Sequence, residues 1–261
     1  LKAQDVTGAD TEASYTMGEW KHEGDKHTVD LTFATDANFA LDVSCTDMAA
    51  NAGNDVEEKL FTVDKVAPAV VGITYSKSLK DVIIEKITFS YYQAPVEVTL
   101  TVTDDTAGVQ RFDYSALLNE NVSGVNAGID GATATDVKQE GKTFTVTFKV
   151  PAEALTNKNQ FNGYVEFTAT DWSANTSAKK SHKEEQSLVV DNIAPKATIT
   201  YNAPVQTVDK VAYYNQEITA IIAIDEANFF SEDVQVTVTR DGVNHPVNVK
   251  WTKANGDVHN G

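Results

Sequence analysis

The stretch Thr143-Phe144-Thr145-Val146-Thr147-Phe148-Lys149-Val150 alternates polar and apolar residues along its whole length. Because successive side chains of a β-strand point to opposite faces, this pattern predicts a strand with one buried and one solvent-facing side. The same alternation recurs at 97–103, 164–169 and 234–239, and no segment shows helical periodicity over three turns. The sequence therefore predicts an all-β chain built from antiparallel sheets.

Two blocks of sequence each occur twice, in the same order. Cys45-Thr46-Asp47-Met48-Ala49-Ala50-Asn51 returns as Ala169-Thr170-Asp171-Trp172-Ser173-Ala174-Asn175. Phe61-Thr62-Val63-Asp64-Lys65-Val66-Ala67-Pro68 returns as Leu188-Val189-Val190-Asp191-Asn192-Ile193-Ala194-Pro195. A conserved order of blocks within one chain is the signature of a structural repeat. The first block is interpreted as a turn between strands, and the second as a short linker in which proline enforces an extended backbone.

A third element links the two ends of the chain. Trp20 precedes Gly24-Asp25-Lys26-His27, and Trp251 precedes Gly256-Asp257-Val258-His259. The outer units are therefore interpreted as one repeat type in different phases, and splicing them gives a unit of about 104 residues, the size of an immunoglobulin-like sandwich. The predicted organisation is tandem immunoglobulin-like β-sandwiches. Residues 1–64 form the C-terminal part of one domain, 65–191 a complete domain, and 192–261 the N-terminal part of another.

Composition excludes several classes of partner. The chain of 261 residues carries a formal net charge of −17, so nucleic acid is excluded as a partner and binding to an anionic membrane surface is disfavoured. The longest purely apolar run, Ala220-Ile221-Ile222-Ala223-Ile224, is too short for membrane insertion of this segment. The single cysteine, Cys45, rules out an intrachain disulfide and is expected to be a small buried residue.

The two repeated blocks resemble the ends of tandem bacterial Ig-like domains in large surface proteins of Gram-positive gut bacteria. In that class the pattern is a Thr-Asp turn ending in Asn, followed by a Val-Asp-Lys-Thr-Ala-Pro linker. This chain departs from it by having Ala50 and Ala174 where the turn usually has glycine. The resemblance implies an extracellular protein attached to the cell wall at a bacterial cell surface.

We expect a non-catalytic structural spacer or stalk, in contact with neighbouring Ig-like domains of the same protein. Two alternatives stay open: an adhesin module that binds a host glycan or protein through sandwich loops, and an accessory region of a larger surface enzyme. Because half a sandwich exposes edge strands, chain–chain strand complementation is also expected unless the ends were trimmed.

Catalytic motifs are absent from the sequence. None of its five histidines lies in a known catalytic pattern, and there is no Gly-x-Ser-x-Gly, phosphate-binding glycine loop or His-Glu-x-x-His. The adjacent acids Asp104 and Asp105 are expected to point to opposite faces of their strand. We therefore expect no enzyme activity and no cofactor other than calcium.

Four aspartates are the candidate calcium ligands. Asp64 and Asp191 lie at the predicted junctions between units, and Asp47 and Asp171 lie in the repeated turns that approach them. Calcium prefers several carboxylate and carbonyl oxygens, which such a junction supplies. The alternative is that each aspartate only caps a turn or ends a strand. A transition-metal site at His22, Asp25 and His27 is a further, weaker alternative.

Trp172 occupies a turn, where an aromatic residue is unexpected. An exposed indole there can stack on a sugar ring. The alternative is that it packs against the edge of the sandwich.

Overall fold

The computed structural model describes residues 2–5, 15–54, 56–120, 128–152 and 160–261. Within these ranges the regular structure is almost entirely β-strand, with a single 3₁₀ turn at Ser231–Asp233 (η1). The predicted all-β class of tandem Ig-like sandwiches is therefore confirmed. None of the described residues forms a helix that could cross a membrane. The chain divides into two compact units, Leu1–Asn192 and Ile193–Gly261.

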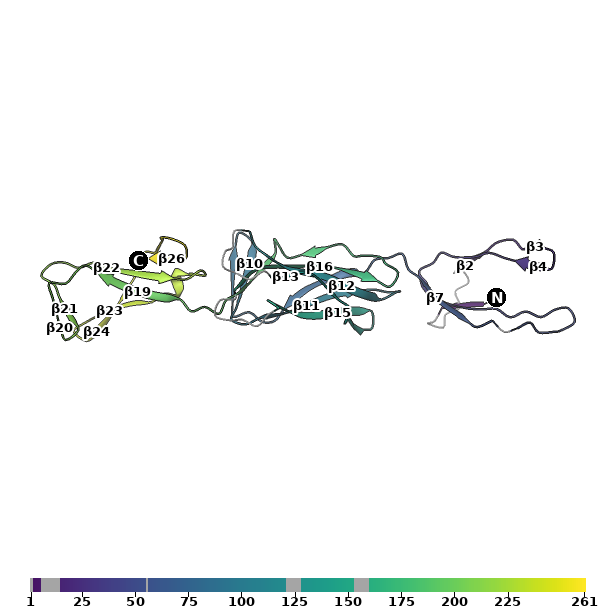
Figure 1. The fold of residues 1–261 in the computed structure, drawn as a ribbon, viewed down its shortest axis with the longest axis horizontal. Helices are drawn as coiled ribbons and strands as arrows, with labels where there is room; N and C mark the ends of the chain where they lie inside the picture. Colours follow the sequence, from purple (N-terminus) through teal and green to yellow (C-terminus); the bar gives the residue numbers. More distant parts are fainter. Residues whose placement is uncertain (1, 6–14, 55, 121–127, 153–159) are drawn as a thin grey trace. The chain divides into compact units, whose positions relative to one another are not determined.

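The middle of the chain is a sandwich of two sheets (Figure 1). The larger sheet has the order β13-β12-β16-β18-β10-β9, with β17 paired to β16. The smaller sheet has the order β14-β15-β11-β8. The strands span β8 Ala69–Tyr75, β9 Lys80–Ile84, β10 Ile87–Tyr92, β11 Val96–Thr103, β12 Val109–Leu118, β13 Ile129–Ala134, β14 Lys138–Glu140, β15 Thr143–Val150, β16 Phe161–Asp171, β17 Lys180–Ser181 and β18 Gln186–Val190.

The core of this sandwich lies between the two sheets. Val98, Leu100 and Val102 of β11 are fully buried, and the residues between them are more exposed, as the alternation predicts. They face buried aromatic side chains of the larger sheet, chiefly Phe112 and Phe167. Burial of apolar surface on this scale is the main stabilising contribution to such a domain.

The residues before the first linker form a smaller sheet, β1-β6-β7, and two hairpins, β2-β5 and β3-β4. Phe33, Phe39 and Phe61 pack together there, with ring centroids 4.9–5.3 Å apart. Of the three, Phe39 is almost completely buried. The strands span β1 Lys2–Asp5, β2 Tyr15–Met17, β3 Lys21–Glu23, β4 Lys26–Thr28, β5 Leu31–Phe33, β6 Ala37–Asp42 and β7 Lys59–Val63.

The C-terminal unit contains a four-stranded sheet, β19-β22-β26-β25, and the hairpins β20-β21 and β23-β24. The β23-β24 turn is Asp241-Gly242, both with positive φ, as a two-residue hairpin turn requires. The strands span β19 Lys196–Tyr201, β20 Gln206–Val208, β21 Val211–Tyr213, β22 Ala220–Asp225, β23 Val236–Arg240, β24 Val243–Val247, β25 Thr252–Lys253 and β26 Val258–Asn260.

Local geometry supports the sequence repeat. The β9-β10 turn places Glu85 and Lys86 at positive φ, and the β20-β21 turn does the same with Asp209 and Lys210. Gly141 precedes β15 with φ of 59°, and Gly256 precedes β26 with φ of 58°. The middle unit therefore keeps the glycine turn of the outer units, although its sequence lacks the tryptophan that precedes it there.

Cys45 does not behave as the sequence analysis expected. Its thiol is free and the residue is exposed. Cys45 lies beyond the end of β6, in the irregular segment that enters the repeated turn. Because β6 ends at Asp42, the alternation of buried and exposed side chains along the strand does not extend to Cys45.

A tyrosine–histidine pair spans the middle sandwich. The Tyr75 hydroxyl, at the end of β8, lies 2.8 Å from Nδ1 of His182, which follows β17. The His182 backbone N–H also donates to the Val165 carbonyl. Burial lowers the pKa of His182 below its ordinary value, and Lys180 acts in the same direction, while Glu185 opposes them.

The lowered pKa of His182 predicts loss of stability on mild acidification. The unfolded chain binds this proton more readily than the native state, so the contribution is fully present above pH of about 6.5 and declines as pH falls towards the native pKa. In urea unfolding between pH 7.5 and 5, His182→Gln should flatten this dependence, and the exposed His245→Gln should not. Equal slopes for wild type and His182→Gln would contradict the assignment.

Candidate metal centre

Three buried aspartates come together at one end of the middle sandwich. Asp64 belongs to the linker after β7, Asp104 follows β11, and Asp171 ends β16. The three are 8%, 7% and 0% exposed. One carboxylate oxygen from each lies within 4.8 Å of the other two. The chain thus gathers three acidic groups that are well separated in sequence.

Asp171 organises the repeated turn. Its Oδ1 accepts the backbone N–H of Asn175, and its Oδ2 accepts the Asn175 side-chain amide, both at 2.8 Å. Asp47 makes the same two bonds to Asn51, also at 2.8 Å. Each turn is also closed by its own antiparallel β-bridge, between Thr46 and Ala52 in the first copy and between Thr170 and Thr176 in the second. The prediction that these aspartates cap local turns matches the bonds seen in both copies.

The alanines that replace glycine in these turns adopt the glycine conformation. Ala50 has φ of 65° and Ala174 has φ of 67°. The left-handed region disfavours a residue with a Cβ by about 1–2 kcal/mol. The Asp–Asn hydrogen bonds therefore stabilise a turn in which the alanine adopts an unfavourable backbone conformation.

Asp104 is fixed by the loop that follows β11. Its Oδ1 accepts the backbone N–H of Gly108 at 2.7 Å and of Thr106 at 3.1 Å. Gly108 has φ of 73°, and a Cβ there would lie 3.2 Å from the Phe144 ring, so glycine is favoured on both counts. Burial raises the pKa of Asp104, the two backbone bonds lower it, and the neighbouring charges of Asp64 and Asp171 raise it further.

Asp64 connects the linker to the sandwich that follows it. Its Oδ2 accepts the backbone N–H of Ala107 at 2.9 Å, and its Oδ1 accepts that of Val66 at 3.0 Å. The Asp64 carbonyl accepts the Asn175 side-chain amide at 3.1 Å. The last residue of the preceding repeat is therefore bonded to two loops of the next.

The donor set suits a hard divalent cation. Within the described ranges, none of the three carboxylates forms an ion pair, so their mutual repulsion is moderated only by N–H donors. Each carboxylate oxygen has about two acceptor positions, so a cation can share oxygens that already accept N–H bonds. Calcium takes about 6–8 oxygen ligands, and nearby carbonyls and water would have to supply those beyond the carboxylates.

The four predicted ligands have different surroundings. Asp64 and Asp171 lie together in the cluster, whereas Asp47 and Asp191 do not belong to it. Asp47 lies in the exposed turn of the N-terminal part. Asp191 follows β18, where its carboxylate accepts the Gln160 side-chain amide at 2.8 Å.

Asp104 was missed by sequence reasoning, although a signal was present. It was considered only with Asp105, and the structure does bury Asp104 and expose Asp105. Comparison of repeats was the available signal. Asp104 N–H donates to the Lys142 carbonyl, and Glu226 N–H donates to the Asp257 carbonyl in the corresponding place. Both acids also accept the N–H two residues further on, so this position is acidic in both units.

Of the predicted transition-metal site at His22, Asp25 and His27, the structure brings together the two histidines. His22 and His27 are cross-strand neighbours in the β3-β4 hairpin, with their Nδ1 atoms 2.5 Å apart. No acidic side chain of the described residues joins them in a group of three ligands. The aspartate cluster is therefore the stronger metal candidate.

Comparison with known proteins assigns no family. The sequence matches no model of a known protein family, and no curated protein matches it. The likeness to bacterial Ig-like repeats rests on the two repeated blocks alone.

Replacing Asp104 with asparagine should stabilise the metal-free protein. An acid with a raised native pKa opposes folding increasingly as pH rises above about 3.8, and an amide removes that charge while keeping an acceptor for Thr106 and Gly108. At pH 7 in chelator, Asp104→Asn should raise Tm by about 2–4 °C for each kcal/mol of repulsion removed.

The matched control is Asp105→Asn, because the Asp105 side chain is 80% exposed and only pairs with Lys142 on the surface. Its Tm should change little. The advantage of Asp104→Asn should disappear below pH of about 3.8, where the carboxyl is protonated in both states. A lower Tm for Asp104→Asn at pH 7 would show that repulsion is not the dominant effect.

Proposed function

We propose that this chain is a non-catalytic spacer region of a bacterial cell-surface protein, in which short linkers restrict the hinge between consecutive β-sandwiches. The observation that carries the proposal is the bonding of Asp64. Its carboxylate and its carbonyl both bond to loops of the following sandwich, at Ala107 and at Asn175.

A linker bonded in this way loses freedom at its N-terminal end, at Asp64. Pro68 fixes φ at about −65° four residues later, and the residue before it is restricted to extended conformations. The segment from Asp64 to Pro68 therefore has few rotatable positions left. A stalk needs this property, because flexible linkers would let successive domains fold back on one another.

Repetition supports the same function. The linker block occurs after both copies of the Asp–Asn turn, so the same kind of junction is encoded twice. The proposal includes a location at the cell wall. It also includes contact with neighbouring Ig-like domains of the same long protein.

Distance distributions between two spin labels test the restricted hinge. The free thiol of Cys45 accepts one label directly, and the exposed Glu140→Cys provides a second site in the middle sandwich. Wild-type linker should give a narrow distribution in double electron–electron resonance. Asp64→Ala removes the two carboxylate bonds and should broaden it.

The matched control is Asp30→Ala, which alters an aspartate of the same N-terminal part that is 75% exposed and pairs with Lys21, away from the linker. It should leave the distribution narrow, because surface ion pairs contribute little. A broad distribution in the wild-type chain would reject the stiff-spacer function.

We further propose that calcium binds at Asp64, Asp104 and Asp171 and strengthens this junction. Bound calcium would offset the repulsion among the three carboxylates while holding the linker residue against the two loops. An ion that binds only the native state stabilises it by about 2.7 kcal/mol at a concentration 100 times its Kd.

Thermal melting with calcium, magnesium and chelator tests this proposal. Calcium should raise the wild-type Tm by about 5–10 °C for a gain of this size in a chain of this length. The response should be lost in Asp104→Asn and kept in Asp105→Asn. An unchanged wild-type Tm up to 10 mM calcium would leave the aspartates as turn caps, without affecting the spacer proposal.

A further inference from the structure

A cavity opens beside the aspartate cluster, in the loops of the middle sandwich. Its volume is about 360 Å³, within the range of about 300–1,000 Å³ typical of small-molecule sites. The loop 104–110 forms one side, and the segments around β14 and the start of β15 form the other. The residues that determine its chemistry are Asp105, Gln110, Gln139, Lys142, Phe144 and Trp172.

Trp172 lines this cavity and is 68% exposed. Most of the Trp172 surface is therefore not packed against the edge of the sandwich, contrary to the alternative prediction. Its backbone N–H donates to the Gly108 carbonyl at 3.2 Å, which ties the Asp171 turn to the loop on the other side of the cavity. An indole held on a bonded turn but left exposed is a ready surface for stacking.

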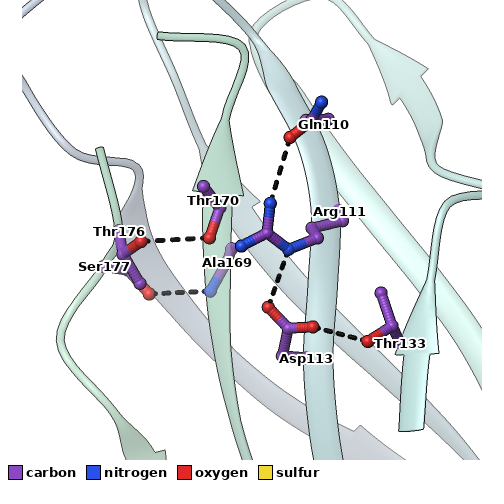
Figure 2. A network of polar contacts seen from close by, with 8 residues as sticks. All are labelled: Gln110, Arg111, Asp113, Thr133, Ala169, Thr170, Thr176 and Ser177. Atoms are coloured by element: carbon purple, nitrogen blue, oxygen red, sulfur yellow. Dashed lines mark hydrogen bonds and ion pairs between the residues drawn. The ribbon is translucent and has the colours of Figure 1, made fainter. Parts of the chain in front are cut away.

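Gln110 is oriented by a polar network of side chains on β12 and β13 (Figure 2). Its Oε1 accepts the Arg111 guanidinium at 3.1 Å, and Arg111 in turn donates to Asp113 at 3.0 Å. Thr133 donates to the other oxygen of Asp113 at 2.6 Å. This bond takes one acceptor position of the Gln110 oxygen, and its amide N–H groups can donate to a ligand.

Gln139 is held through its nitrogen. Its Nε2 donates one N–H to the Gly141 carbonyl at 3.0 Å, so its Oε1 keeps its acceptor positions. The cavity wall therefore carries two side-chain amides, each oriented by a hydrogen bond, that can donate to and accept from a ligand. Lys142 and Asp105 pair with each other at 3.0 Å, so their opposite charges compensate at the rim.

These features together select one class of ligand. Phosphates and nucleotides need a net positive surface, whereas Lys142, the only cation among the described residues that line this cavity, is already paired with Asp105. Apolar ligands need a mostly apolar enclosure, whereas this cavity is open and lined largely by polar groups. A pyranose ring has apolar C–H faces that stack on an indole and hydroxyls that both donate and accept hydrogen bonds.

We infer that this cavity binds a neutral pyranose unit of a glycan, with one face of the ring on Trp172 and its hydroxyls bonded to Gln110 and Gln139. The inference gives the chain a recognition function beyond that of a spacer and does not depend on the spacer proposal.

Nuclear magnetic resonance of the whole chain tests the inference. The probes are the methyl glycosides of glucose, galactose, mannose and N-acetylglucosamine, each titrated to tens of millimolar. At least one should show saturation transfer from the protein and shift the indole N–H signal of Trp172. That signal is assigned by its absence in Trp172→Ala, and the chain has only two other tryptophans.

Trp172→Ala should weaken binding about tenfold, which corresponds to the loss of about 1.4 kcal/mol of stacking and burial on the indole. Gln139→Ala should also weaken it, and Gln139→Asn, which keeps a side-chain amide, should do so less. The matched control is Trp20→Ala, which removes a tryptophan of similar exposure outside the cavity and should leave affinity unchanged.

The folding state is checked by melting, and Trp172→Ala should melt as wild type does because its side chain is mostly exposed. Absence of saturation transfer for every glycoside would overturn the inference. Binding that survives in Trp172→Ala would also overturn it, because the sugar would then lie elsewhere.

Discussion

Buried carboxylates that are satisfied by backbone N–H groups control the end of the middle sandwich. Each of the three aspartates shapes one segment: Asp104 folds the loop after β11, Asp171 folds the turn after β16, and Asp64 fixes the linker. Because burying an ionised group is unfavourable, each segment must place its N–H donors where a carboxylate needs them. The loop geometry, the junction and the neighbouring cavity all follow from this constraint.

The fold class was readable from sequence because it depends on side-chain period. The alternation at 97–103 and 143–150 reappears as β11 and β15, paired residue for residue. The Asp–Asn turns were readable for a similar reason, since a short polar side chain bonds its own local backbone. Both signals are contained within a few residues, and no distant partner is needed to interpret them.

Only two of the three clustered aspartates were predicted from the sequence, because the cluster joins segments that are distant in sequence. Asp64 and Asp171 were found through the repeated blocks, and Asp104 was overlooked because its block differs between units, as Thr103-Asp104-Asp105 and Asp225-Glu226-Ala227 show. The hydrogen bonds of Asp104 and Glu226 show that these two residues hold equivalent positions. The cavity was not predicted at all, since it depends on how the β14 region approaches the loop after β11.

Asp64 also shows that the sequence repeat and the folded domain do not share a boundary. By sequence Asp64 ends one repeat, yet its carboxylate and carbonyl complete the loops of the next one. A recombinant middle sandwich that starts at Lys65 would therefore leave the amides of Ala107 and Asn175 without this partner, whereas one that starts before Val63 would keep it. The middle sandwich, in this sense, is completed by the last residue of the repeat before it.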